Sequence, residues 1–156
     1  MSQDGKRMKV AITRFDPDQD EAPRLQEYEI PTEPAWKVLD AINYIKDNID
    51  PTIAHRWSCR MAVCGSCGMM VNGEPKLTCK TALDQYEGRI VIEPLANFPI
   101  VRDLVVELDG FMHKFRSVKP WILRAKEKAE DHGDFNAKGT FSQTPDQLSS
   151  FKQFSM

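Results

Sequence analysis

All four cysteines of this chain lie within one short stretch, and thiols are side chains that favour soft metal ions. They are Cys59, Cys64, Cys67 and Cys79, in the pattern C-x4-C-x2-C-x11-C. Thiols grouped in this way can form disulfides, a zinc site, an iron–sulfur site or a redox switch. Their spacing and the residues between them discriminate among these chemistries.

The spacing favours an iron–sulfur site. Structural zinc sites normally contain two close cysteine pairs separated by a longer spacer, whereas here the first three thiols share one loop and Cys79 follows later. A thioredoxin-like pair, Cys64-x-x-Cys67, would leave Cys59 and Cys79 unexplained. Disulfides are rare in the cytosol. The C-x4-C-x2-C run matches the plant-type spacing of 2Fe–2S proteins, in which each iron takes two thiolates.

A hairpin can return the last cysteine to the others. Asn72-Gly73 is a strong signal for a two-residue hairpin turn, and it lies midway between Cys67 and Cys79. Pro75 cannot donate a ladder hydrogen bond, which indicates an edge strand. Gly65 permits backbone conformations in which amide groups approach the sulfurs. We therefore expect a glycine-containing loop closed by a hairpin.

Charged and aromatic residues surround the first cysteine. Arg56 and Arg60 flank Cys59 and can raise the reduction potential of a cluster by stabilising its more negative reduced form, although surface ion pairs are the plainer interpretation. We expect Trp57 to pack rather than to relay electrons, and His55 to be a surface histidine rather than a proton-coupled group. No combination of histidine, acid and nucleophile indicates catalysis, so we expect a non-catalytic chain.

Periodicity predicts the elements that position these cysteines. Alternating apolar residues indicate strands, and an apolar stripe at helical spacing indicates a helix that packs on a sheet. The predicted class is α+β with a small mixed sheet. We expect a half-buried strand at 8–15, a second strand at 25–30 that pairs with it, a helix that begins at Thr32–Pro34 and ends at Asp50-Pro51, a strand at 89–93 and a helix at 101–115.

Bulk composition excludes several classes of protein. Hydrophobic residues make up 41% and charged residues 28% of the chain, as in a globular domain. The net charge of −2 argues against a nucleic-acid partner, which needs a basic face. No apolar run reaches the length of about 18 residues that a membrane span requires. The start of the chain lacks the apolar core of a secretion signal, so we expect a cytoplasmic protein.

The segment HRWSCRMAVCGSCGMMVNGEPKLTCKT, residues 55–81, closely resembles the cluster-binding segment of the iron–sulfur subunits of fumarate reductase and succinate dehydrogenase. The resemblance extends back to DAINYIKDNID at 40–50 and forward through LANFPIVRDLVVEL at 95–108 and SVKPWI at 117–122. It covers roughly residues 8–156. The run Arg60-Met61-Ala62-Val63 is more similar to the fumarate reductase branch.

This resemblance implies a β-grasp, plant-type 2Fe–2S ferredoxin-like domain with a C-terminal helical extension. It implies that Cys59 and Cys64 hold one iron and that Cys67 and Cys79 hold the other. It also implies a relay role, in which electrons pass between an FAD-containing flavoprotein subunit and further clusters or quinone at a membrane anchor. Such a complex is peripheral on the cytoplasmic face of the inner or cell membrane. A free-standing ferredoxin that serves a different flavoprotein is the alternative, although such carriers are usually more acidic.

The resemblance also divides the chain. We expect the ferredoxin-like domain at 1–110, a linker and surface segment at 111–143, and the start of a helical second domain at 144–156, where Thr144-Pro145-Asp146-Gln147 forms a capping box. In the family, that second domain carries cysteines for a 3Fe–4S and a 4Fe–4S cluster. This sequence contains no cysteine after Cys79, so we expect a truncated second domain.

Overall fold

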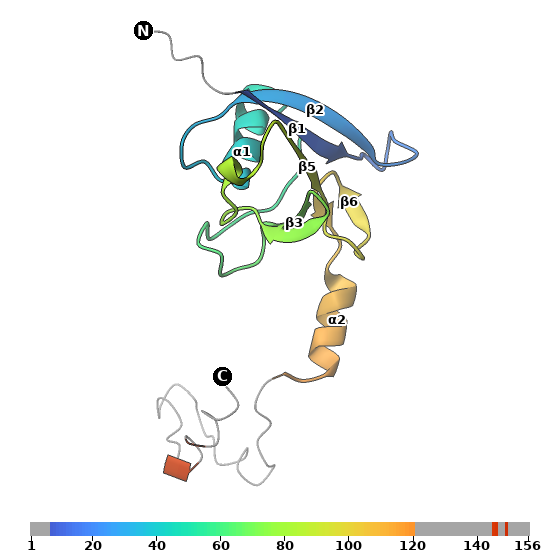
Figure 1. The fold of residues 1–156 in the computed structure, drawn as a ribbon. Helices are drawn as coiled ribbons and strands as arrows, with labels where there is room; N and C mark the ends of the chain where they lie inside the picture. Colours follow the sequence, from blue (N-terminus) through green and yellow to red (C-terminus); the bar gives the residue numbers. More distant parts are fainter. Residues whose placement is uncertain (1–6, 121–144, 147–148, 150–156) are drawn as a thin grey trace. The chain divides into compact units, whose positions relative to one another are not determined.

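The structure is a computed structural model that describes residues 7–120, 145–146 and 149. The chain divides into two compact units, Met1–Met112 and His113–Met156, and the first contains the sheet and all the cysteines (Figure 1). The helix expected to begin at Thr144 falls largely outside the described residues. Within that segment the structure describes Pro145, Asp146 and Ser149, and these residues are helical. Within the described residues, no helix is both long and apolar enough to span a bilayer.

A five-stranded mixed sheet forms the centre of the first unit, in the order β2-β1-β5-β3-β4 (Figure 1). Two antiparallel hairpins are joined through β5, which runs parallel to β1 and antiparallel to β3. One helix packs on this sheet, which is the predicted α+β arrangement. The strands are β1 (Arg7–Arg14), β2 (Arg24–Pro31), β3 (Gly68–Val71), β4 (Glu74–Leu77) and β5 (Arg89–Glu93), and a short 3₁₀ turn, η1 (Leu83–Gln85), precedes β5.

Strand β1 is buried on both faces, so the prediction of a half-buried strand is wrong. Its apolar face contributes Val10 and Ile12 to the core, but Ala11 and Thr13 on the other face are also buried. The reason is the position of β1 between two neighbours. Ala11 lies opposite Glu27 on β2 and Val91 on β5, so its short side chain is flanked by longer ones on both sides.

Helix α1 (Val38–Asn48) places its apolar stripe on the sheet, where Val38, Ile42 and Ile45 join the main core. It begins later than the Thr32–Pro34 start that we expected. Residue Ala35 has a φ of 70°, so the preceding segment turns instead of entering the helix. The cap is provided by the Asp40 carboxylate, which accepts the Lys37 N–H at 2.9 Å; this satisfies a donor that the helix leaves unpaired.

The single helix expected at 101–115 is also wrong. The structure has a short hairpin, β6 (Ile100–Arg102) and β7 (Val105–Val106), followed by a helix, α2 (Asp109–Ser117). Asp103 forms the turn of this hairpin with a φ of 47°, and both its carboxylate oxygens accept hydrogen bonds from distant segments. These tertiary bonds outweigh the helical periodicity of the apolar residues, because helix propensity is a weak preference.

Candidate iron–sulfur site

The predicted hairpin brings Cys67 and Cys79 together. Strands β3 and β4 pair from Gly68 opposite Leu77 to Val71 opposite Glu74, and both turn residues between them have positive φ angles of 49° and 80°, as a type I′ turn requires. Thr78 extends the pairing, since its N–H donates to the Cys67 carbonyl at 3.1 Å. The hairpin and the edge position of β4, with its proline, are therefore confirmed.

The loop before β3 wraps its backbone around the sulfur of Cys59. The N–H groups of Met61, Val63 and Cys64 each donate to the Cys59 Sγ at 3.4 Å. Positive φ angles at Arg60 (55°), Ala62 (58°) and Gly65 (75°) turn these amides inward. The sequence indicated only the glycine. For the other residues this backbone region is strained and is typical of functional loops.

The thiols form two neighbouring pairs. Cys64 is exposed and its N–H donates a hydrogen bond to the Cys59 Sγ, whereas Cys67 and Cys79 are buried and pack together against Leu39 of α1. Hydrogen bonds from Ser66, and then from Cys59, lower the pKa of Cys64 to about 6. Burial, and then the hydrogen bond with Cys67, raises the pKa of Cys79, which also senses the Cys59 thiol. All the predicted ligands are thus mutually connected.

This donor set fits a 2Fe–2S cluster. In the part of the chain that the structure describes, no group of three or more His, Cys, Asp or Glu side chains is arranged to hold one metal ion. A 2Fe–2S cluster sets a different requirement, because each iron takes two thiolates. The paired thiols supply this number, and the inward amides supply the donors that a cluster of thiolates needs.

The arginines near Cys59 make contacts other than the ion pairs that we expected. The guanidinium of Arg60 lies 4.3 Å above the centre of the Trp57 ring, which is a cation–π contact. Arg56 Nη1 donates to the Val106 carbonyl at 3.2 Å. Trp57 therefore packs against a cation that lies next to Cys59 in the sequence.

His55 is half-buried, so the expectation of a surface histidine is wrong. Its Nε2 lies 2.8 Å from the Asn43 Oδ1, and its buried Nδ1 has no hydrogen-bond partner among the described residues. Burial, and then the charge of Lys46, lowers the pKa of His55 to about 4. The imidazole is neutral near pH 7, and it donates to Asn43 through Nε2–H.

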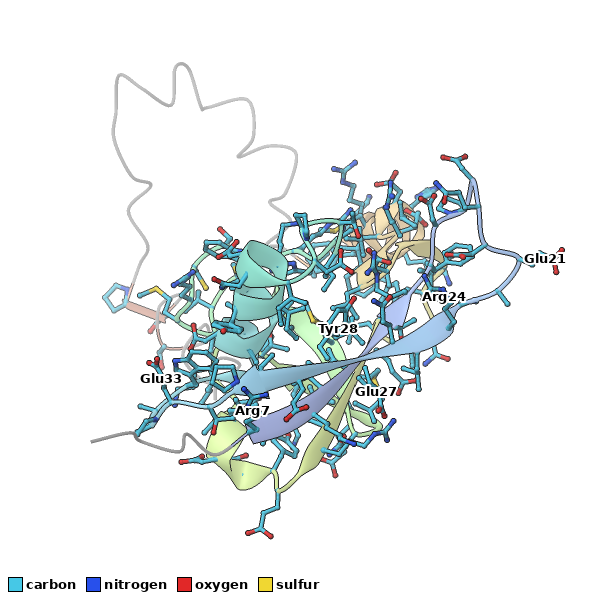
Figure 2. The ribbon with its side chains drawn as sticks, turned by 90° about the horizontal axis from the view of Figure 1, so that it is seen from above. Arg7, Glu21, Arg24, Glu27, Tyr28 and Glu33 are labelled. Atoms are coloured by element: carbon cyan, nitrogen blue, oxygen red, sulfur yellow. The ribbon has the colours of Figure 1, made fainter. Side chains whose placement is uncertain are left out.

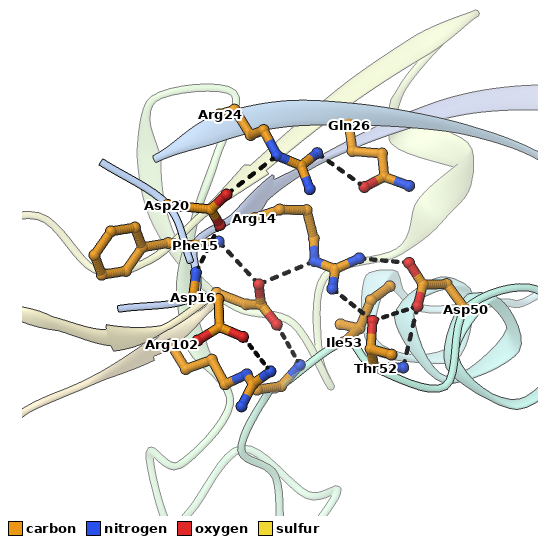
Figure 3. A network of polar contacts seen from close by, with 12 residues as sticks. Arg14, Phe15, Asp16, Asp20, Arg24, Gln26, Asp50, Thr52, Ile53 and Arg102 are labelled. Carbon is orange, nitrogen blue, oxygen red and sulfur yellow. Dashed lines mark hydrogen bonds and ion pairs between the residues drawn. The ribbon is translucent and has the colours of Figure 1, made fainter. Parts of the chain in front are cut away.

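Sequence reasoning missed a buried polar network beside the cysteine loop, centred on Arg14 (Figure 3). Its guanidinium donates to Asp103 Oδ1 at 2.9 Å and to the Tyr28 hydroxyl at 2.8 Å, and it pairs with Asp50. Tyr28 lies on the buried side of β2, whereas the neighbouring Glu27 is exposed (Figure 2). The available signal was weak, because Arg14 and Asp103 each adjoin an apolar run that also includes another charged residue, Lys9 or Arg102.

Comparison with known proteins agrees with this site. The model of the 2Fe–2S iron–sulfur cluster binding domain family matches residues 9–113. The chain belongs to this family. The 2Fe–2S cofactor that we predicted is therefore confirmed as the cofactor of the domain.

Curated relatives of this 2Fe–2S protein are iron–sulfur subunits, as the resemblance implied. The chain is 48% identical over 153 residues to the fumarate reductase iron–sulfur subunit of Haemophilus influenzae, covering 96% of this chain and 60% of the relative. For the Mycobacterium tuberculosis fumarate reductase subunit the identity is 47%, with 96% and 59% covered. The succinate dehydrogenase subunit of Paracoccus denitrificans is 41% identical over 113 residues, with 72% and 44% covered. The chain thus spans about 60% of the length of its fumarate reductase relatives.

Solved structures show the same fold. A chain of the Mycobacterium smegmatis Sdh1 complex in the apo form superposes with a TM-score of 0.75 at 24% identity, covering 96% of this chain and 59% of that chain. The likeness confirms the ferredoxin-like α+β fold of the 2Fe–2S domain.

Proposed function

We propose that this chain is the 2Fe–2S part of an electron-transferring iron–sulfur subunit of the fumarate reductase or succinate dehydrogenase type. Cys59 and Cys64 would hold one iron, and Cys67 and Cys79 would hold the other. The observation that carries this proposal is the loop whose N–H groups surround the Cys59 Sγ beside the exposed Cys64, together with the buried Cys67–Cys79 pair at the hairpin. The names of the relatives supply the kind of complex.

A 2Fe–2S cluster supplies reversible one-electron chemistry when it is bound. The residues of the chain have two tasks toward it. Leu39 and Leu77 pack beside the buried thiols and exclude water from the inner side, while the amides that point to the Cys59 Sγ offset negative charge. On the outer side, Cys64 is exposed, so electrons can leave or enter there without a protein layer in between.

The proposed partners are an FAD-containing flavoprotein subunit on one side of the relay and further clusters, quinone and a membrane anchor on the other. The proposed location is peripheral, on the cytoplasmic face of the membrane that holds the anchor. The relatives' names support a place in such a complex, and the family resemblance implies these partners and this location. The chain itself would carry out no acid, base or nucleophilic step.

The ligand assignment is tested by anaerobic reconstitution of the full chain with iron and sulfide. We expect a red-brown protein that contains two irons and two sulfides per chain, with a rhombic EPR signal after reduction, as for a 2Fe–2S protein held by four thiolates. Each single cysteine-to-serine variant should lose or alter this signal. Ser58→Ala is the matched control, because it changes an exposed loop residue beside Cys59 and leaves every thiol in place. A colourless wild-type protein, or serine variants with unchanged spectra, would refute the assignment.

The partner is tested separately by affinity purification of the chain from its own cells. Co-purification of a flavin-containing protein whose bound flavin reduces the cluster supports the relay within a complex. Recovery of the loaded chain alone, with reduction by an unrelated soluble flavoprotein, would indicate a free-standing ferredoxin instead.

A further inference from the structure

The segment that leads into the cysteine loop is fastened to the β6–β7 hairpin. We call residues 54–56 the loop root. The Ala54 N–H donates to Asp103 Oδ2 at 2.8 Å, and the Leu104 N–H donates back to the Ala54 carbonyl at 3.2 Å. The Arg56 side chain adds its bond to the Val106 carbonyl at 3.2 Å. The root is thus tied to a segment that lies 49 to 50 residues further along the chain.

Asp103 is the fixed point of this attachment. Its side chain is 3% exposed, and its other oxygen, Oδ1, accepts the Arg14 Nε–H and the Phe15 N–H, both at 2.9 Å. Arg14 is itself held by Thr52 and Asp50 (Figure 3) and by the Tyr28 hydroxyl. A carboxylate whose oxygens all accept buried donors has one orientation, because leaving such a donor unpaired is costly.

The root is connected to the first thiol by a short series of contacts. Trp57 follows Arg56 directly. The guanidinium of Arg60 lies over the Trp57 ring, so this contact joins the residues on either side of Cys59 in the sequence. Next to the root attachment, His55 is held by Asn43 of α1. Cys59 follows the root by three residues, so the position of the root restricts where Cys59 can lie.

We propose that Asp103 is a positioning residue for the cluster: it fixes the loop root through the Ala54 amide and so sets where Cys59 and its surrounding N–H groups lie. The proposal rests on the proposed function, because it takes Cys59 as a cluster ligand. Asp103 acts through the backbone and touches no thiol.

Asp103→Asn isolates this action. If the asparagine oxygen takes the place of Oδ1, the bonds to Arg14 and Phe15 are kept, and the amide NH₂ then faces the Ala54 N–H, donor against donor. The opposite orientation would lose two bonds to keep one, so the first is preferred. The variant therefore removes the Ala54–Asp103 bond and leaves in place the bonds that the root makes with Leu104 and Val106. Tyr28→Phe is the matched control, since it removes a hydroxyl from the same network and leaves Ala54 and Asp103 bonded.

The experiment compares wild-type, Asp103→Asn and Tyr28→Phe full-length chains, each loaded with the cluster. Three quantities are measured: urea unfolding, the rate of iron release to a chelator, and the EPR g-values with the reduction potential. For Asp103→Asn we expect iron release on the order of tenfold faster, the size of one lost hydrogen bond to a charged group, together with altered g-values and a shifted potential. For Tyr28→Phe we expect lower stability with g-values, potential and release rate close to those of the wild type.

The outcomes separate the possibilities. Wild-type spectra and release in Asp103→Asn, or changes in both variants that only follow their stability, would overturn the positioning role while the proposed function stands. A wild-type chain without a cluster would overturn the proposed function itself. If Asp103→Asn does not fold, Arg56→Met decides, because this exposed side chain provides the second of the two side-chain ties of the root: faster release with altered g-values supports the proposal, and wild-type behaviour overturns it.

Discussion

Acid should destabilise this domain through His55, and the structure gives the size of the effect. The pKa of this imidazole is about 4 in the folded chain, against an ordinary value of 6.5. Between these pH values the unfolded chain binds a proton on His55 that the folded chain does not bind. The contribution of the neutral His55 to the free energy of unfolding is therefore fully present above pH 6.5 and is lost as the pH falls toward 4. From about pH 7 to about pH 5 the loss attributable to this group is on the order of 2 kcal/mol.

The physical cause is the burial of Nδ1, with Lys46 adding to it and Asp47 opposing it. A proton on Nδ1 would be buried without an acceptor among the described residues. His55→Gln keeps a donor toward Asn43 and does not titrate. Its stability should therefore depend less on pH than that of the wild type, by about the 2 kcal/mol derived from the pKa difference.

The assay is urea unfolding followed by circular dichroism at several pH values, with the wild type and His55→Gln measured side by side. The difference in the free energy of unfolding between the two chains should change steadily as the pH falls. His113→Gln, on exposed helix α2, is the control for the loss of a histidine as such. A wild-type-to-His55→Gln difference that stays constant with pH would refute the burial argument.

Three further predictions concern stability. The pKa of Tyr28 is raised to about 12 by burial and then by its hydrogen bond to Asp50. The stability that its neutral hydroxyl contributes should therefore be fully present below pH 10 and be lost as the pH rises toward 12. Absorbance at the tyrosinate band, measured against pH, checks this prediction. Gly73→Ala at a φ of 80° should cost about 1 kcal/mol, whereas Gly110→Ala inside α2 should be neutral or stabilising by up to about 1 kcal/mol; equal effects in thermal unfolding would contradict the turn argument. Arg14→Lys should cost roughly 2–3 kcal/mol because a single ammonium cannot replace the buried fork, whereas Arg7→Lys in an exposed pair should stay within about 0.5 kcal/mol; urea midpoints compare the two.

Local patterns in the sequence located the cysteine site well. The turn at Asn72-Gly73 and the strand at 89–93 appear in the structure where the sequence placed them. The stripe of α1 also packs as predicted, since Val38 and Ile45 are buried. These features follow from residues within one turn or one strand of each other, which is the range over which periodicity and turn chemistry act.

Longer-range features could not be derived in this way. Whether 101–115 becomes a helix or a hairpin depends on Asp103, whose ion-pair partner Arg14 is 89 residues away. The start of α1 depends on Lys37, which pairs with Ala82 across the fold. The burial of His55 depends on Asn43 and on the packing around it.

The sequence by itself thus indicated which thiols we propose as iron ligands, because ligand type and loop spacing are local properties. Only the tertiary structure decided how the loop is held, since Asp103, Arg14 and Ala54 lie far apart in the chain and meet only when β1, the segment after α1 and the β6–β7 hairpin come together. Hydrogen bonds between buried groups are specified by where the backbone brings them, and no pattern along the chain encodes that position.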